Sequence, residues 1–276
     1  MTVIFKAKTH CAYTIKILAE LLQNNIKTAC FELDEDGIKL SMMDHHETIL
    51  IKLSLESENF TFYKFKLKEK KFLGINLNHF HRMLKSIKKK DSLQLFINDE
   101  FPNDLGIKVI PKENNRITTS FIKIQEKQNI SIEVPTGYDK PVIVPSSEYQ
   151  KMCKDMAHIG NMIRVTSKNF YIKFICNAGG VMKRNVEFGE MSDSDDDDDD
   201  EDESKSNEYV DDFDTEQLSR ITKMAGLSSN MQIYPKHKKP LLFKSSVGSL
   251  GKISIYIKSK DQIEKDKHAV ESDDDF

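Results

Sequence analysis

The histidine and acidic residues of this sequence are the first candidates for chemistry, because imidazole and carboxylate groups bind metal ions and transfer protons. His45 and His46 stand between two acids, Asp44 and Glu47. Neighbouring residues of a strand point to opposite faces, and no further ligand follows at a metal-binding spacing. We therefore expect no metal site.

The four cysteines and the acidic run Asp195–Asp200 also fail to form a catalytic set. The cysteines are far apart, and each stands in an apolar pattern that is typical of small buried side chains. A catalytic carboxylate pair needs a rigid concave site, which a run of like charges does not provide. No Ser-His-Asp or Cys-His arrangement is present. We predict a protein that is not an enzyme and uses no cofactor.

Basic residues spaced along helix faces are the remaining pattern with functional chemistry. Three of four predicted amphipathic helices carry Lys or Arg opposite their apolar stripe, at spacings that share one helix face. Such side chains neutralise backbone phosphates without reading bases, although a solvated surface is the plain alternative. The residues are Arg82, Lys85 and Lys89, then Lys151 and Lys154, then Arg220 and Lys223, while the first helix has only Lys16.

The net charge of −3 hides a strong asymmetry along the chain. Residues 190–203 carry eleven acids and no base, and without them the net charge rises to +8. Four more acids lie in the last six residues, and without these the remainder carries +12. A basic body with acidic appendages favours a polyanionic partner.

The elements that position these residues are mostly strands, interrupted by four helical segments. Alternating apolar residues predict the strands, and Asp36-Gly37 predicts a tight hairpin turn between two of them. The helices are predicted over Thr9–Asn24 and Leu77–Ile87, after Pro145-Ser146, and from Asp214, where Gln217 completes a capping-box spacing.

The helical segments recur in a pattern that predicts two similar α+β domains. Helices begin near residues 10 and 77 and again near 146 and 214. We expect an N-terminal domain over 1–122, a linker over 123–139 and a C-terminal domain over 140–258. The acidic segment 190–207 is predicted to be a disordered insert, and 259–276 a disordered acidic tail.

Several short segments follow one another in a recognisable order. They are Gly37-Ile-Lys-Leu-Ser-Met-Met-Asp44, Leu73-Gly-Ile-Asn-Leu77 followed by Met83-Leu84-Lys85, Pro145-Ser-Ser-Glu-Tyr, Cys153-Lys-Asp-Met-Ala-His-Ile-Gly160, Thr222-Lys223, Leu227-Ser-Ser229, Pro240-Leu-Leu and the Gly251–Ile257 strand. Together these segments resemble the proliferating cell nuclear antigen family of sliding clamps. The resemblance covers about residues 3–258 and implies the DNA-clamp fold, with two helices packed on antiparallel sheets in each domain.

The resemblance implies a homotrimeric ring that encircles double-stranded DNA without regard to its sequence and acts as a processivity factor for a DNA polymerase. The positions it assigns to DNA are Lys16, Arg82, Lys85, Lys151, Lys154 and Lys223, whereas Lys89 and Arg220 rest on helical spacing alone. Further partners would be a clamp loader and the peptides of ligases and nucleases.

The family binds partner peptides in an apolar pocket beneath the linker, and the matching positions are Met43, Leu50, Ile130, Ile132, Pro240, Tyr256 and Ile257. The sequence departs from the family at Glu47 and Thr48, where a histidine and a small apolar residue line that pocket. It also has Lys258-Ser259 where an Ala-Pro pair follows the last strand. These departures leave the partner preference open.

Two alternatives stay open beside the homotrimeric clamp: a subunit of a heterotrimeric checkpoint clamp, and a chaperone-type interaction protein that works through its acidic insert. The chain contains no membrane-spanning apolar run and no signal-peptide pattern. We expect a nuclear protein, or one of a cytoplasmic virus factory if its origin is a large DNA virus.

Overall fold

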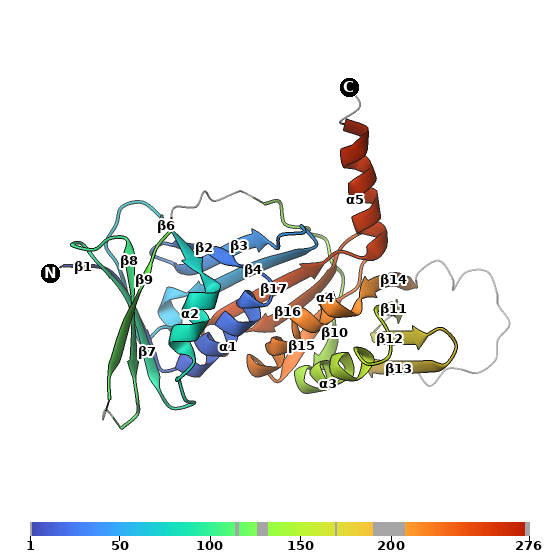
Figure 1. The fold of residues 1–276 in the computed structure, drawn as a ribbon, viewed down its shortest axis with the longest axis horizontal. Helices are drawn as coiled ribbons and strands as arrows, with labels where there is room; N and C mark the ends of the chain where they lie inside the picture. Colours follow the sequence, from blue (N-terminus) through green and yellow to red (C-terminus); the bar gives the residue numbers. More distant parts are fainter. Residues whose placement is uncertain (1, 114–115, 126–131, 169, 190–207, 274–276) are drawn as a thin grey trace. The chain divides into compact units, whose positions relative to one another are not determined.

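The computed structural model describes residues 2–113, 116–125, 132–168, 170–189 and 208–273 (Figure 1). The chain forms two compact units. Unit 1 contains Met1–Glu133, Gly226–Ser228 and Ser245–Ile255, and unit 2 contains Val134–Ala225, Ser229–Lys244 and Tyr256–Phe276. The predicted insert 190–207 lies outside the described residues.

Unit 1 consists of two antiparallel sheets with two helices packed together. The strand orders within it are β5-β1-β7-β8-β9 and β17-β4-β3-β2-β6. The bounds are β1 Val3–Thr9, α1 Ala12–Gln23, β2 Thr28–Leu33, β3 Gly37–Met43, β4 Ile49–Glu56, a 3-10 turn Ser57–Asn59, β5 Phe62–Phe65, β6 Lys71–Asn76, α2 Leu77–Leu84, β7 Ser92–Asn98, β8 Asp104–Ile110, β9 Thr118–Lys123 and β17 Gly251–Ile257.

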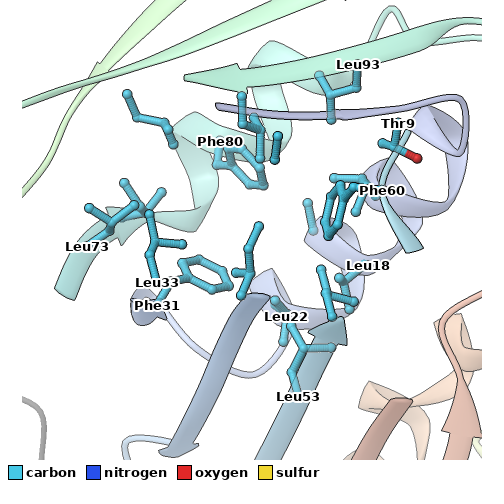
Figure 2. Close-up of a pocket in the computed structure, with 18 of the residues that line it drawn as sticks. Thr9, Leu18, Leu22, Phe31, Leu33, Leu53, Phe60, Leu73, Phe80 and Leu93 are labelled. Atoms are coloured by element: carbon cyan, nitrogen blue, oxygen red, sulfur yellow. The ribbon is translucent and has the colours of Figure 1, made fainter. Parts of the chain in front are cut away.

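The core of unit 1 lies where the apolar faces of both sheets meet α1 and α2. Leu18 and Leu22 of α1 and Phe80 of α2 are buried there beside sheet residues such as Phe31 and Leu93 (Figure 2). They line an apolar cavity of about 50 Å³. The alternating strand pattern therefore places one face of each sheet inward, as predicted.

Helix α2 begins as expected but ends earlier. Asn76 caps its first turn by accepting a hydrogen bond from the His79 N–H at 3.1 Å. Its last residue is Leu84, because the chain then turns so that Asp91 accepts from the Lys88 N–H at 2.8 Å. The expectation that Lys89 shares this helix face is therefore wrong: Lys89 lies in the loop after the helix.

Unit 2 repeats the plan of two helices on antiparallel sheets. Its strand orders are β10-β15-β16 and β13-β12-β11-β14. The bounds are β10 Val142–Pro145, α3 Ser146–Met156, β11 Met162–Lys168, β12 Tyr171–Ala178, β13 Met182–Gly189, β14 Tyr209–Asp214, α4 Thr215–Arg220, a 3-10 turn Thr222–Gly226, β15 Asn230–Tyr234, β16 Leu241–Ser246 and α5 Lys260–Asp273. The predicted two-helix, antiparallel-sheet plan is thus present in both units.

The predicted helix starts in unit 2 are confirmed, but the predicted capping bonds at Asp214 are not. Helix α3 starts at Ser146, directly after Pro145. Asp214 occupies the N-cap position of α4 without a side-chain capping bond, and the Gln217 Oε1 atom is buried without a hydrogen-bond partner. The fourth helical segment is also shorter than its apolar stripe predicted, since α4 ends at Arg220.

The expected disordered tail is instead largely helical. Ser259 is buried, its N–H donates to Gln262 Oε1 at 2.9 Å, and its hydroxyl accepts from the Gln262 N–H at 3.4 Å. This reciprocal pair is a capping box and starts α5. Lys258 adds an ion pair to Asp266 at 2.7 Å. The prediction of disorder from the density of acidic residues is therefore wrong for this segment, because the segment begins with a capping box.

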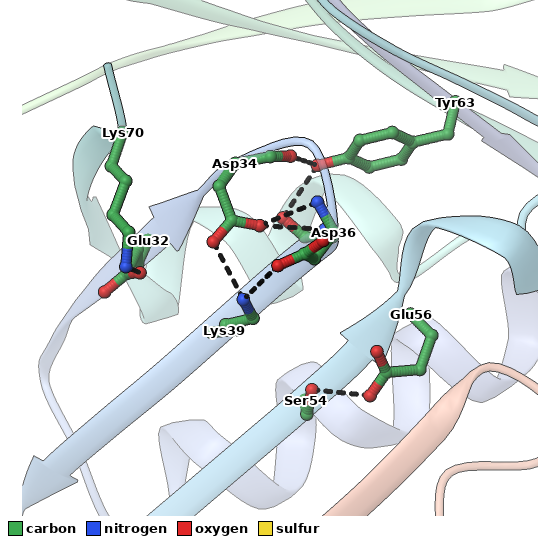
Figure 3. Close-up of polar contacts among 9 residues, drawn as sticks. Glu32, Asp34, Asp36, Lys39, Ser54, Glu56, Tyr63 and Lys70 are labelled. Atoms are coloured by element: carbon green, nitrogen blue, oxygen red, sulfur yellow. Dashed lines mark hydrogen bonds and ion pairs between the residues drawn. The ribbon is translucent and has the colours of Figure 1, made fainter. Parts of the chain in front are cut away.

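The hairpin between β2 and β3 is held by a buried carboxylate (Figure 3). Asp34 accepts hydrogen bonds from the Gly37 N–H and the Lys39 ammonium at 3.0 and 2.8 Å. The Tyr63 hydroxyl lies 2.7 Å from the carbonyl oxygens of both Asp34 and Gly37. Gly37 is required at this turn, because a Cβ there would lie 2.0 Å from the Leu55 carbonyl oxygen.

The hairpin carboxylate has a shifted pKa. Burial acts to raise the pKa of Asp34, but the hydrogen bond and charge of Lys39, with the backbone N–H groups, outweigh burial and lower it. A depressed folded-state pKa stabilises the fold above the unfolded-state pKa, and this contribution disappears as pH falls through the folded value.

None of the helices in the described part of the chain combines the length and apolarity needed to cross a lipid bilayer.

Asp34→Asn is expected to lower the free energy of unfolding at pH 7 by about 1–3 kcal/mol, because the ionised acceptor is lost. The difference from wild type should shrink as pH falls through the Asp34 pKa, since both side chains are then neutral. Urea unfolding at pH 7 and at successively lower pH values measures this difference and its decline. Asp36→Asn is the matched control, because that side chain is largely exposed and should change stability little at any of these pH values. Equal losses in the two variants would contradict the assignment.

Candidate nucleic-acid interface

Lys16 on α1 is tied to the end of the neighbouring helix. Its ammonium donates to the carbonyl oxygens of Lys85 and Ile87 at 2.8 and 3.1 Å. These carbonyls lie at and just beyond the C-terminal end of α2, where helix carbonyls lack partners within the helix. The cation also compensates the negative end of the helix dipole. Lys16 thus has a structural role in joining α1 to α2.

The predicted basic stripe of α2 is divided by the early helix end. Arg82 lies in the last turn, Lys85 is the C-cap residue, and both side chains are exposed. Lys89 is exposed in the following loop. Arg82 and Lys85 also border a surface hollow together with polar residues such as Gln23 and Asn78. Arg82 and Lys85 are therefore exposed cations at the end of α2.

Lys151 and Lys154 form the clearest pair among the predicted positions. Both are exposed on α3, while Tyr149, Met152, Cys153 and Met156 on the same helix are buried. The Tyr149 hydroxyl donates to the Leu218 carbonyl at 3.0 Å and anchors α3 to α4. The helix thus separates a fixed apolar face from a solvent-exposed basic one, as its periodicity predicted.

Arg220 and Lys223 fall on different elements. Arg220 ends α4 and pairs with Glu216 at 2.7 Å across one helical turn. Lys223 lies in the 3-10 turn that follows. Both side chains are only partly exposed. They therefore do not continue one straight helical stripe.

The exposed cations carry the charge that attracts phosphates. Burial raises the pKa of the Cys153 thiol to about 12, so this thiol is protonated at neutral pH and is a poor nucleophile. Within the described ranges, no group of three or more His, Cys, Asp or Glu side chains is arranged to hold a metal ion. Exposed lysines and arginines such as Lys151 and Lys154 are the residue types that attract polyanions.

In unit 1, two of the residues predicted for the partner pocket, Met43 and Ile132, border a hollow of about 820 Å³. Leu50 is only 4% exposed and belongs to the core beneath. Ile130 lies outside the described residues. The hollow is also lined by Lys27, Cys30 and Glu47, so it is more polar than an apolar peptide site would suggest.

The departure at Glu47 and Thr48 belongs to a tight turn around a buried carboxylate. Asp44 accepts from the backbone N–H groups of Thr48 and Ile49 at 2.8 and 2.9 Å, and from the Thr48 hydroxyl at 3.2 Å. Glu47 adopts a left-handed backbone with φ of 56°. Thr48 is thus held by Asp44, and Glu47 is exposed at the rim of the hollow.

In unit 2, the predicted pocket residues Pro240 and Tyr256 surround an aromatic side chain that sequence reasoning missed. Tyr138 donates its hydroxyl to the Pro240 carbonyl at 2.8 Å and lies against Tyr234 and Tyr256 with ring centroids 6.3 and 6.1 Å apart. The sequence feature that could have indicated Tyr138 is a single aromatic residue next to Gly137 in a polar linker. Ile257, by contrast, is fully buried.

The ends of two sheets present open strand edges. β9 is the outermost strand of its sheet in unit 1, and β13 is the outermost strand of its sheet in unit 2. Large apolar side chains are exposed at or beside them, with Phe121 58%, Val181 86% and Met182 52% exposed. An open edge with exposed apolar residues is a template for pairing with another strand.

Comparisons with known proteins agree with this architecture. The N-terminal domain model of proliferating cell nuclear antigen matches residues 4–131, and the C-terminal domain model matches residues 132–260. A probable DNA polymerase sliding clamp from Paramecium bursaria Chlorella virus 1 is 25% identical over 92% of this chain and 96% of its own. Proliferating cell nuclear antigen from Dictyostelium discoideum is 24% identical over 93% of this chain and 99% of its own.

The fold is likewise shared with a solved structure. Proliferating cell nuclear antigen from Entamoeba histolytica superposes with a TM-score of 0.79 at 20% identity, covering 94% of this chain and all of that one. Because the two family models together match nearly the whole chain, from residue 4 to residue 260, the chain belongs to the proliferating cell nuclear antigen family.

Proposed function

We propose that this chain is a subunit of a closed ring that encircles duplex DNA and holds a DNA polymerase on it. The observation that carries the proposal is the match of both family domains in tandem over residues 4–260. A ring is retained on DNA by its topology, so weak contacts that ignore base sequence are sufficient and still allow sliding. The exposed lysines of α3 provide such contacts.

The cations proposed to face DNA contribute unequally. Lys151, Lys154, Arg82 and Lys85 are exposed and can reach phosphates. Lys16 is bound to two carbonyls and contributes mainly its charge. Lys89, Arg220 and Lys223 lie off a common stripe, so their contacts would be looser.

A homotrimer is the assembly that we propose. Open edges at β9 and β13 of one chain can pair with the opposite edges of identical chains, and such a head-to-tail contact closes into a ring. A chain that needs two different partners, as in a checkpoint clamp, would not close with copies of itself. Burial of Met182 on the β13 side would add apolar stabilisation to the paired strands.

We further propose that peptides of a polymerase, a clamp loader, a ligase and nucleases bind at the hollow of unit 1 that Met43 and Ile132 border. Pro240 and Tyr256 of unit 2 are proposed as peptide contacts in their own unit. A partner peptide inserts apolar and aromatic anchors into a site of this kind. Glu47 at the rim favours peptides with a basic residue beside their anchors. The site of action would be the compartment where DNA is replicated: a nucleus, or a cytoplasmic factory for a viral protein.

The ring proposal predicts a self-trimer of roughly three times 31.8 kDa by light scattering. Thr119→Pro should shift the mass toward the monomer. The Ile124 N–H donates to the Asn103 carbonyl and so points toward β8. Because N–H groups alternate in direction along a strand, the Thr119 N–H points away from β8, to the free edge of β9. Thr119→Val keeps this N–H and should remain trimeric. A monomeric wild type, or an unchanged mass in Thr119→Pro with a normal melting temperature, would contradict closure through β9.

If α3 faces DNA, Lys151→Glu with Lys154→Glu should reduce processive synthesis on long templates by at least tenfold. The two substitutions lower the net charge of each chain by about four units next to the DNA phosphates. The trimer should persist. Lys68→Glu with Lys112→Glu makes the same charge change on exposed loops and serves as the control. If both double variants support synthesis equally, α3 does not face DNA.

Deletion of the acidic insert distinguishes the clamp hypothesis from the chaperone hypothesis. Removal of residues 190–206 should leave clamp-stimulated DNA synthesis within about twofold of wild type, since none of the cations proposed to face DNA lies in this segment. Primer extension with and without the segment measures this. Loss of stimulation with an intact trimer would show that the insert is the functional element.

A further inference from the structure

The outward face of the β5-β1-β7-β8-β9 sheet is unusual in unit 1. The inward residues of these strands, such as Phe5, Leu93 and Ile107, are buried. Figure 1 shows α1 and α2 on that inner side, and no described element of the unit covers the other side. Because side chains alternate along a strand, the residues between the buried ones share one free surface.

Three phenylalanines lie on this free surface. Phe62 on β5 is 44% exposed, Phe121 on β9 is 58% exposed, and Phe96 on β7 is partly exposed. The rings of Phe96 and Phe121 are 6.0 Å apart and edge to face. Exposed aromatic rings on a strand face contribute little to the core, so their clustering points to a ligand.

Gly106 makes room for this arrangement. It stands between Phe96 and Phe121 in the strand register. A Cβ at Gly106 would lie 2.3 Å from the Phe96 ring, so the ring lies flat across the glycine. The strand is thus shaped to hold an aromatic ring against the sheet surface.

Lysines surround the rings on the same face. Lys6 lies opposite both Lys64 and Phe96, and Lys8 lies opposite Phe62. Lys108 stands beside Gly106 in the next outward position of β8. The Lys6 ammonium is 5.4 Å from the centre of the Phe62 ring. One further lysine, Lys123, is paired with Asp104 at 2.7 Å. The face is therefore both aromatic and basic.

This combination differs from that of the exposed helix faces. Neighbouring strands are about 4.8 Å apart, so Phe62 and Phe96, two strands apart, are separated by roughly 10 Å or more across the sheet. The rings and lysines thus alternate across the strands. Unpaired bases stack on aromatic side chains, while lysines neutralise the phosphates between them. Duplex DNA can contact only the lysines of such a surface, because its bases are already stacked.

We propose that this sheet face binds single-stranded nucleic acid, with bases stacked on Phe62, Phe96 and Phe121 and phosphates held by Lys6, Lys8, Lys64 and Lys108. The surface lies on the opposite side of the sheet from α1 and α2. It therefore constitutes a second nucleic-acid site, distinct from the helix lysines, and does not depend on ring closure.

The test is fluorescence anisotropy of a labelled oligothymidylate of about 20 nucleotides with the full chain. Phe62→Thr with Phe96→Thr should weaken binding at least tenfold. Threonine suits exposed strand positions, and β9 is left unaltered. Phe101→Thr is the matched control, since Phe101 is 56% exposed in the loop after β7. An abasic chain of the same length keeps the phosphates but removes the bases, and should bind wild type at least tenfold more weakly than oligothymidylate.

The proposal is overturned if oligothymidylate binds the Phe62/Phe96 variant as tightly as the Phe101 variant, or if the abasic chain binds wild type equally well. It is also overturned if the Phe62/Phe96 variant loses only its affinity for the polymerase, which would make this face a protein contact. Thermal melting and light scattering of each variant show that the fold and the assembly are unchanged. Lys6→Glu with Lys64→Glu should give a similar loss and a shallower salt dependence.

Discussion

The two-helix, antiparallel-sheet plan of each unit depends on burying one stripe of every helix against the apolar face of a sheet. In α3, Tyr149 and Met152 are buried and leave Lys151 and Lys154 no position except the solvent side. In α1, the same constraint directs Leu18 and Leu22 inward. The hydrophobic effect therefore determines where the basic residues lie. Electrostatic attraction to DNA acts on a pattern that packing has already set.

Packing also explains why the fold was readable from sequence while some site residues were not. The apolar alternation of the strands and the start of α3 at Ser146 are local signals, and the structure has both. The end of α2 depends on Asp91 holding the Lys88 N–H, a contact that periodicity does not reveal. The role of Lys16 depends on Lys85 and Ile87, about 70 positions further along the chain. Contacts between distant segments were the ones that sequence reasoning could not supply.

Departures from the family have local physical causes. Lys258 and Ser259 replace an Ala-Pro pair because they start α5, through the capping box with Gln262 and the ion pair with Asp266. Thr48 belongs to the hydrogen-bonded turn around Asp44. Both sites lie next to residues matched to the family's peptide pocket. Each departure is thus part of a local hydrogen-bonded structure in its own unit.

Two surfaces of unit 1 offer different chemistry to nucleic acid. The helix side presents cations such as Arg82 and Lys85, which attract phosphates regardless of the state of the bases. The outer sheet side adds phenylalanine rings, and these bind only bases that are free to stack. A protein at a replication site meets both double and single strands. Separating the two chemistries on opposite sides of one sheet would let it hold each form without competition between them.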